Sequence, residues 1–323
     1  MGFGDFYSIC EQAAVPLCAE VGAISTIAGS HGIEATCYSR NIELANTIIF
    51  QAAASFVHIL ALIMTVIMIL HVKSKFTAVG RKEIITFFYI YMLLTFITLL
   101  LDSGVIPPGT GPYPYFSAIQ NGLTSALTVC LLINGFVGFQ LYEDGTPISV
   151  WLLRSISFAM FTLTFLVSLA TYMSWAGLGP TRTIGLFVVL YLLSAIELAI
   201  YGVMQVLLVV NTLQDRWPLG ELSFALFFFA AGQVVLYAFS ATICNAIDHY
   251  LDGLFFASIA NLLAYWDSIT KEDLEFSVGI KQNNWEVKDL LEDERRNTVY
   301  QDMDYQHSPG HQPRNSNYGG FNY

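Results

Sequence analysis

The chain has 323 residues, of which 55% are hydrophobic and only 12% are charged, and its formal net charge is −11. A soluble domain carries about 25% charged residues, so this composition excludes an ordinary soluble protein and indicates an integral membrane protein. The acidic balance also excludes the basic surface with which proteins bind nucleic acids, and we expect no nucleic-acid partner.

The N-terminal segment, residues 1–46, is predicted to form a separate part of the chain outside the membrane. It contains three cysteines, Cys10, Cys18 and Cys37, and its only basic residue is Arg40. Its beginning lacks the positive charge and the continuous apolar core of a cleaved signal peptide. We therefore expect the first transmembrane helix to direct the chain to the membrane.

Residues 47–266 are predicted to form an all-α bundle of seven transmembrane helices. About 20 apolar residues cross the hydrocarbon core of a bilayer. The runs that are long enough cover residues 47–71, 84–104, 116–140, 151–173, 184–212, 219–241 and 243–266. The sixth and seventh runs nearly touch, so we expect a tight turn around Thr242.

The distribution of Lys and Arg predicts the orientation of this polytopic bundle. If the N-terminus is lumenal or extracellular, every Lys and Arg except Arg40 and Arg182 lies on the cytosolic side. The C-terminus is then cytosolic. Residues 267–323 are predicted to form an acidic cytosolic tail, disordered beyond about residue 300 because that part cannot bury enough apolar surface to order itself.

The same orientation places four of the five cysteines on the oxidising side of the membrane. Cys10, Cys18 and Cys37 lie in the N-terminal segment, and Cys244 lies at the turn between the sixth and seventh helices. An even number of cysteines there allows up to two disulfides, which would staple the segment to itself or to that turn. The alternative is free thiols in an unstructured segment. The pairing cannot be deduced from the sequence, and none of the spacings is typical of a metal site.

Two ionisable side chains lie near the middle of predicted membrane helices, His58 in the first and Glu197 in the fifth. An ionised carboxylate at the centre of a membrane helix costs about 2.5–3.5 kcal/mol. Glu197 should therefore be neutral, paired or facing water, and His58 is its candidate partner. The more common use of such groups is a hydrogen bond that joins two helices.

Four further polar side chains lie within the seventh run: Asn245, Asp248, His249 and Asp252. On a single helix, at about 100° per residue, these four would share one face. A polar stripe on a membrane helix must face protein or water, which makes it a candidate recognition site. We expect it to contribute either to the interior of the bundle or to the binding of a partner.

Catalytic motifs are missing from the sequence. H-E-x-x-H, G-x-S-x-G and the phosphate-binding loop do not occur, and of the six histidines only His58 and His249 lie within the predicted membrane region, at different depths. We therefore predict that the chain is not an enzyme and needs no metal or cofactor. The alternative function is a membrane transporter or receptor that uses the polar groups of the first, fifth and seventh helices.

Several stretches within residues 1–280 resemble one protein family, in order and at similar spacing. They are DFYSIC (5–10), CYSRNIELANTIIF (37–50), KFTAVGR (75–81), DSGVIPPGTGPYPYF (102–116), GFQLYEDGT (138–146), AGQVVLYAFS (231–240) and DLEF (273–276). In these stretches the chain resembles the fungal chitin synthase export chaperone family.

This resemblance implies a multi-pass protein of the endoplasmic reticulum membrane with no catalytic activity. It implies that the protein assists the folding and vesicular export of a chitin synthase, which is itself polytopic, and so supports the synthesis of cell-wall chitin. The implied partners are the chitin synthase, the vesicle export machinery and membrane lipids.

Overall fold

The computed structural model describes residues 4–23, 32–44, 47–74, 81–137, 146–212 and 217–264. By its internal contacts the chain separates into two units, Met1–Asp273 and Leu274–Tyr323. All described residues belong to the first unit. The predicted cytosolic tail, residues 267–323, lies outside the described residues.

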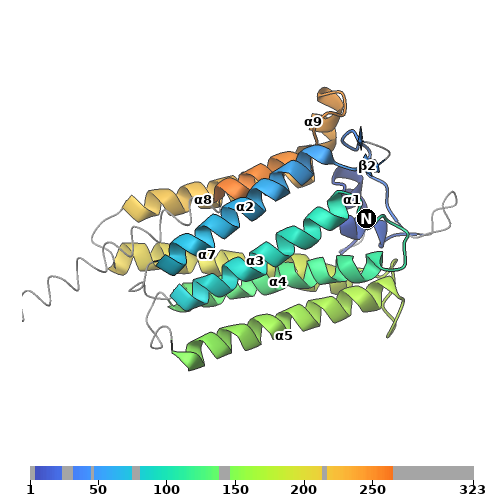
Figure 1. The fold of residues 1–323 in the computed structure, drawn as a ribbon. Coiled ribbons are helices and arrows are strands. Elements are labelled where there is room, and N and C mark those ends of the chain that lie inside the picture. The colour runs from blue at the N-terminus through green and yellow to red at the C-terminus, as the bar shows by residue number, and fades with distance from the viewer. Residues whose placement is uncertain are drawn as a thin grey trace, which may run out of the picture. The chain divides into compact units, whose positions relative to one another are not determined.

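Among the described residues, six helical spans are long and apolar enough to cross a membrane (Figure 1). The first four are α2 (Ala52–Ser74), α3 (Arg81–Asp102), α4 (Tyr113–Val137) and α5 (Pro147–Tyr172). The fifth and sixth spans, Ile184–Asn211 and Leu222–Ala246, are each built from more than one element. The prediction of a helical, multi-pass membrane protein is therefore confirmed.

The fifth and sixth spans each contain one turn of π-helix. The fifth span consists of α6 (Ile184–Phe187), the π-helical η2 (Val188–Leu192) and α7 (Leu193–Thr212). The sixth span consists of α8 (Trp217–Val234), the π-helical η3 (Val235–Phe239) and α9 (Ser240–Ala246). The two π-turns face each other, because the Tyr237 hydroxyl lies 3.2 Å from the Tyr191 hydroxyl. Such turns widen a helix locally and often occur where a helix must adapt to a neighbour or a site.

α4 is the central helix, since it packs against α3, α5 and α7. Small residues permit these close approaches. A Cβ atom at Gly122 would lie 2.9 Å from the ring of Phe161 on α5, so only glycine fits there. In a membrane, where lipid is as apolar as leucine, such close backbone packing is a main source of helix association.

The N-terminal segment is folded onto the ends of the spans. It contains α1 (Tyr7–Gln12), the 3₁₀ turn η1 (Pro16–Ala19) and β1 (Ile42–Leu44). β1 forms a short antiparallel hairpin with β2 (Thr47–Ile49), which directly follows the segment. This hairpin is a small departure from the predicted all-α fold. A cluster of buried side chains joins the segment to the spans that it covers: Phe6, Cys10, Leu17, Cys18, Val21, Ala118, Leu169, Tyr172, Leu186 and Leu190.

The predicted turn around Thr242 is wrong. α9 continues through Thr242 to Ala246, and the chain reverses only over residues 247–252. No glycine or proline occurs near Thr242 to end the helix. A further apolar helix, Gly253–Ala264, follows the turn. Its described part is shorter than the about 20 residues that a span requires, and the predicted seventh span continues beyond the described residues.

Glycines bring this last helix against the sixth span. The backbone N–H of Gly253 donates to Ser240 Oγ at 3.0 Å, and a Cβ atom on Gly253 would collide with the Ser240 side chain. A Cβ atom on Gly232 would lie 2.9 Å from Ala260 Cβ. The reversal at residues 247–252 is therefore followed by a tightly packed helix pair.

Candidate functional site

His58 on α2 pairs with Asp102, the last residue of α3. His58 Nε2 lies 3.0 Å from Asp102 Oδ2, and the two side chains are 12% and 1% exposed. The proposed pairing of His58 with Glu197 is therefore wrong. Asp102 was not predicted as the partner, because it ends an apolar run and begins a loop rich in glycine and proline. In a solvated loop a carboxylate has no desolvation cost. In the folded chain Asp102 is buried, and a buried charge requires a partner.

Glu197 on α7 is held by α4. The hydroxyl of Thr128 donates to Glu197 Oε2 at 2.7 Å, and Glu197 is only 6% exposed. The contact joins two helices of the same chain, which is the common role of polar groups in membrane bundles.

Uncharged polar side chains join α4 to α5. Asn121 Nδ2 donates to the Tyr172 hydroxyl at 2.8 Å and to Ser168 Oγ at 3.3 Å, and the Ser117 hydroxyl lies 3.2 Å from the Tyr172 hydroxyl. All four residues are buried. These four residues were not predicted as a site, because uncharged polar side chains are common in membrane helices. The signal was the concentration of Ser, Thr and Asn in two apolar runs.

The four polar residues of the seventh run do not form a stripe on one helix. Asn245 lies on α9, Asp248 and His249 lie in the following turn, and Asp252 precedes the last helix. The first three are exposed, whereas Asp252 is only 2% exposed. The expected common face assumed an unbroken helix. The chain breaks that helix with two consecutive residues of positive φ, +49° at Asp248 and +65° at His249.

Asp252 has a structural role in this turn. Its Oδ1 accepts the backbone N–H of Phe255 at 3.1 Å, the geometry of a helix N-cap, and its Oδ2 accepts the Ser39 hydroxyl at 3.3 Å. Burial raises the pKa of Asp252, and the hydrogen bonds from Phe255 and Ser39 oppose this rise. The side chain fixes the start of the last helix and ties it to the N-terminal segment.

The four cysteines predicted on the oxidising side form two disulfides. Cys10 pairs with Cys18 inside the N-terminal segment, and Cys37 pairs with Cys244 at the end of α9. One bridge therefore closes the segment on itself, and the other ties it to the turn after the sixth span. Cys130 on α4 is a buried free thiol.

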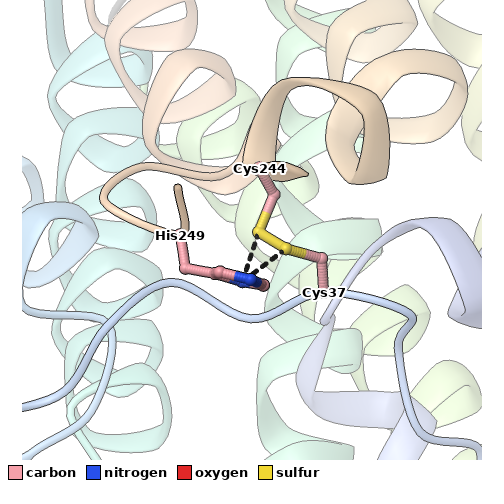
Figure 2. A group of neighbouring side chains, drawn as sticks. All are labelled: Cys37, Cys244 and His249. Carbon is pink, nitrogen blue, oxygen red and sulfur yellow. Dashed lines mark hydrogen bonds between the residues drawn. A yellow bond between two sulfur atoms is a disulfide. The ribbon is translucent and has the colours of Figure 1, made fainter. Parts of the chain in front are cut away.

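Around the second bridge, residues 37–40 contact residues 244–252, and we refer to these two stretches together as the disulfide joint. Arg40 donates its backbone N–H to the His249 carbonyl at 2.7 Å, and its guanidinium lies 4.4 Å from the centre of the Tyr250 ring. Figure 2 shows the imidazole of His249 directed at the bridge, with Nδ1 3.0 Å from Cys37 Sγ and 3.8 Å from Cys244 Sγ.

Among the described residues, the Cys37, Cys244 and His249 group has the spacing of a metal site, with its ligand atoms within 4.8 Å of one another. A metal ion is bound by the thiolate form of cysteine. Because the two sulfurs are bonded to each other, they offer no thiolate, and we assign no metal to this group.

One acidic side chain of the N-terminal segment is perturbed by burial. Glu20 follows η1, and burial raises its pKa from 4.5 to about 7. Nearby, the Tyr113 hydroxyl donates to the Pro16 carbonyl at 3.0 Å, and both residues are buried. Burial therefore disfavours the charged form of the Glu20 carboxyl group.

Comparison with known proteins gives one consistent result. The family model described as chitin synthase export chaperone matches residues 2–280. A protein of that name from Chaetomium globosum is 68% identical over 312 residues, which cover 94% of each chain. One from Aspergillus fumigatus is 67% identical over 332 residues, which cover 100% of each chain. No solved structure matches.

Proposed function

Because the chain belongs to the chitin synthase export chaperone family, we propose that it is a membrane chaperone that assists the folding and vesicular export of a chitin synthase. The observation that carries this proposal is the extent of the similarity. The family match begins at residue 2 and ends at residue 280, so it includes the N-terminal segment and all six described spans. Through its client, the protein supports the synthesis of cell-wall chitin.

We further propose that it acts in the endoplasmic reticulum membrane, with seven spans, its N-terminus in the lumen and its C-terminus in the cytosol. Two observations support this orientation. Nearly all Lys and Arg residues fall on the side assigned to the cytosol, as the positive-inside rule requires. The two disulfides involve only the N-terminal segment and the turn after the sixth span, and disulfides persist in oxidising compartments such as this lumen.

The polar groups inside the bundle support a chaperone more than a transporter or receptor. His58 pairs with Asp102, and Glu197 accepts from Thr128, so each contact joins two helices of this chain. A transported solute needs polar groups that are open to it, and these are engaged with each other. We also keep the prediction that the protein is not an enzyme, because these paired groups include no nucleophile beside a base.

The exposed residues of the turn after α9 are the remaining candidates for client recognition. Asn245, Asp248 and His249 are exposed, whereas Asp252 is buried in the joint. We propose that Asp252 belongs to the interior of the protein and that Asn245 and Asp248 are available to a partner on the lumenal side.

The proposed function is tested by following a fluorescently tagged chitin synthase in fungal cells with and without this protein. We expect the synthase to accumulate in the endoplasmic reticulum without it, and re-expression to restore delivery to the cell surface. The retained synthase should still form chitin in isolated membranes supplied with its sugar-nucleotide substrate. Normal surface delivery in cells that lack the protein would contradict the proposal.

A further inference from the structure

The two disulfides lie in different surroundings. Cys10 is 0% and Cys18 is 3% exposed, and both pack in an apolar cluster with Phe6, Leu17 and Val21. Cys37 is 5% and Cys244 0% exposed, but their bridge carries the imidazole of an exposed histidine (Figure 2). Only the second bridge is therefore connected to water through a group that can transfer a proton.

The backbone holds His249 in this position at a conformational cost. Asp248 and His249 both have φ in the left-handed region, at +49° and +65°, which non-glycine residues adopt rarely. Hydrogen bonds fix the strained residue on both sides: its N–H donates to the Cys244 carbonyl at 2.9 Å, and its carbonyl accepts from the Arg40 N–H at 2.7 Å. Strained backbone persists where the surrounding structure enforces it, and such positions cluster at functional sites.

We propose that Cys37, Cys244 and His249 form a thiol–disulfide exchange site that reacts with an external dithiol, His249 acting as its proton donor. This site goes beyond the chaperone function and does not depend on it. Exchange proceeds by attack of a thiolate on one sulfur of a disulfide, and its rate depends on how well the other sulfur leaves. An imidazole that protonates the leaving sulfur assists that step.

Of the two cysteines, Cys37 is the one that retains some exposed surface, and we place the attack there. Cys37 keeps 5% of its surface and Cys244 none, so the incoming thiolate bonds to Cys37 Sγ. The Cys37–Cys244 bond breaks, and its electron pair leaves on Cys244 Sγ, which takes a proton from His249 at 3.8 Å. The second thiolate of the dithiol then attacks the sulfur of the same dithiol that is bonded to Cys37. This step breaks the mixed disulfide and releases Cys37 Sγ, which is protonated in turn. The protein disulfide is reduced to two thiols, and the dithiol is oxidised to a disulfide.

Exchange at this site opens the disulfide joint. Without the bridge, residues 37–40 are held to the turn by weaker contacts, among them the Ser39 hydroxyl on Asp252 and the Arg40 guanidinium on the Tyr250 ring. The packing of α1 and η1, which depends on the Cys10–Cys18 bridge and the apolar cluster, stays intact. The site therefore controls the attachment of residues 37–40 to the turn without unfolding the rest of the segment.

The test uses the full-length protein in detergent micelles or lipid nanodiscs, with dithiothreitol as the dithiol. Samples are quenched by alkylation, and mass spectrometry reports the reduction of each bridge. We expect Cys37–Cys244 to be reduced at least about tenfold faster than Cys10–Cys18, and His249→Asn to slow the first reaction by about tenfold without changing the second. Asparagine tolerates the left-handed backbone, so this variant keeps the turn. Asp248→Asn, at the neighbouring exposed position, is the matched control and should leave both rates unchanged.

A monothiol gives a second measurement on the unmodified protein. Glutathione should stop at a mixed disulfide, and the adduct should be found on Cys37. Equal reduction rates of the two bridges, an unchanged rate in His249→Asn, or an adduct mainly on Cys244 would overturn the proposal. The wild-type comparison of the two bridges remains decisive if the His249 variant does not fold. These experiments do not measure client export. A negative result would therefore overturn the exchange site and leave the proposed chaperone function untouched.

Discussion

His58 and Asp102 form a hydrogen-bonded pair between two helices, with Nε2 and Oδ2 3.0 Å apart and both side chains largely buried. Asp102 ends α3, and His58 lies one turn and a half into α2. Such a pair holds the ends of the two helices in one register, because either side chain alone would be a buried polar group without its partner.

His58→Leu should destabilise the protein, because it leaves the carboxylate of Asp102 buried without its partner. Breaking a buried pair by removing one member costs about 3–5 kcal/mol. The double variant His58→Leu with Asp102→Leu should be closer to the wild type, because both polar groups are then absent. Thermal unfolding in detergent measures the effect, with the exposed Leu93→Ala on α3 as the control. Equal destabilisation by the single and double variants would show that the pair is not coupled.

Cys37→Ser and Cys244→Ser should have the same effect on stability. Each removes the bridge between the N-terminal segment and the turn after α9, and loss of a native disulfide typically costs about 2–5 kcal/mol. The double variant should be no less stable than either single variant. Thermal unfolding of the purified proteins measures this, and additive losses would mean that the two cysteines act independently.

Asp252→Ala and Asp248→Asn should differ although the residues are close in sequence. Asp252 caps the last helix and accepts from Ser39, so its loss should cost about 1–2 kcal/mol and lower the amount of folded protein. Asp248 is exposed, and asparagine tolerates its φ of +49°, so Asp248→Asn should leave stability unchanged. Protein abundance and thermal unfolding distinguish the two variants. If Asp248→Asn leaves a stable protein but blocks delivery of the synthase, Asp248 is part of the client surface.

Glu20 should make the N-terminal segment more stable at acidic pH. Because burial raises its pKa from 4.5 to about 7, the folded state binds the proton more tightly than the unfolded state. The stabilisation is fully present below about pH 4.5 and is lost as the pH rises through about 7. Hydrogen exchange of residues 7–19 across this range measures the effect.

Glu20→Gln should remove this pH dependence, because glutamine does not titrate. Glu34→Gln, at an exposed position of the same segment, is the control and should retain it. If protection of the segment is independent of pH in the wild type, Glu20 does not contribute to its packing.

The spans could be predicted because hydropathy is a local property of the chain. The second run, residues 84–104, corresponds to α3, and the fifth, residues 184–212, corresponds to the span Ile184–Asn211. The end of the sixth span could not be predicted in this way. The helix ends at Ala246 within an apolar run, where Asp248 and His249 take a positive φ and no glycine or proline marks the turn.

The polar contacts were harder to predict than the spans. His58 and Glu197 were identified as groups that need partners, but their partners were not, because Asp102 looks like a loop residue and Thr128 like an ordinary helix residue. The stripe was inferred from helical periodicity, and Asp248 and His249 break that periodicity with a turn. The role of His249 depends on that turn and on a cysteine of the N-terminal segment, so it could be found only in three dimensions.

A vesicle-budding reaction with endoplasmic reticulum membranes prepared with and without this protein tests the proposed chaperone function. We expect packaging of the chitin synthase into vesicles to fall strongly in the membranes that lack the protein, while packaging of an unrelated polytopic cargo is unchanged. Adding the protein back during membrane preparation should restore packaging of the synthase. Equal packaging of the synthase from both membrane preparations would contradict the proposed function.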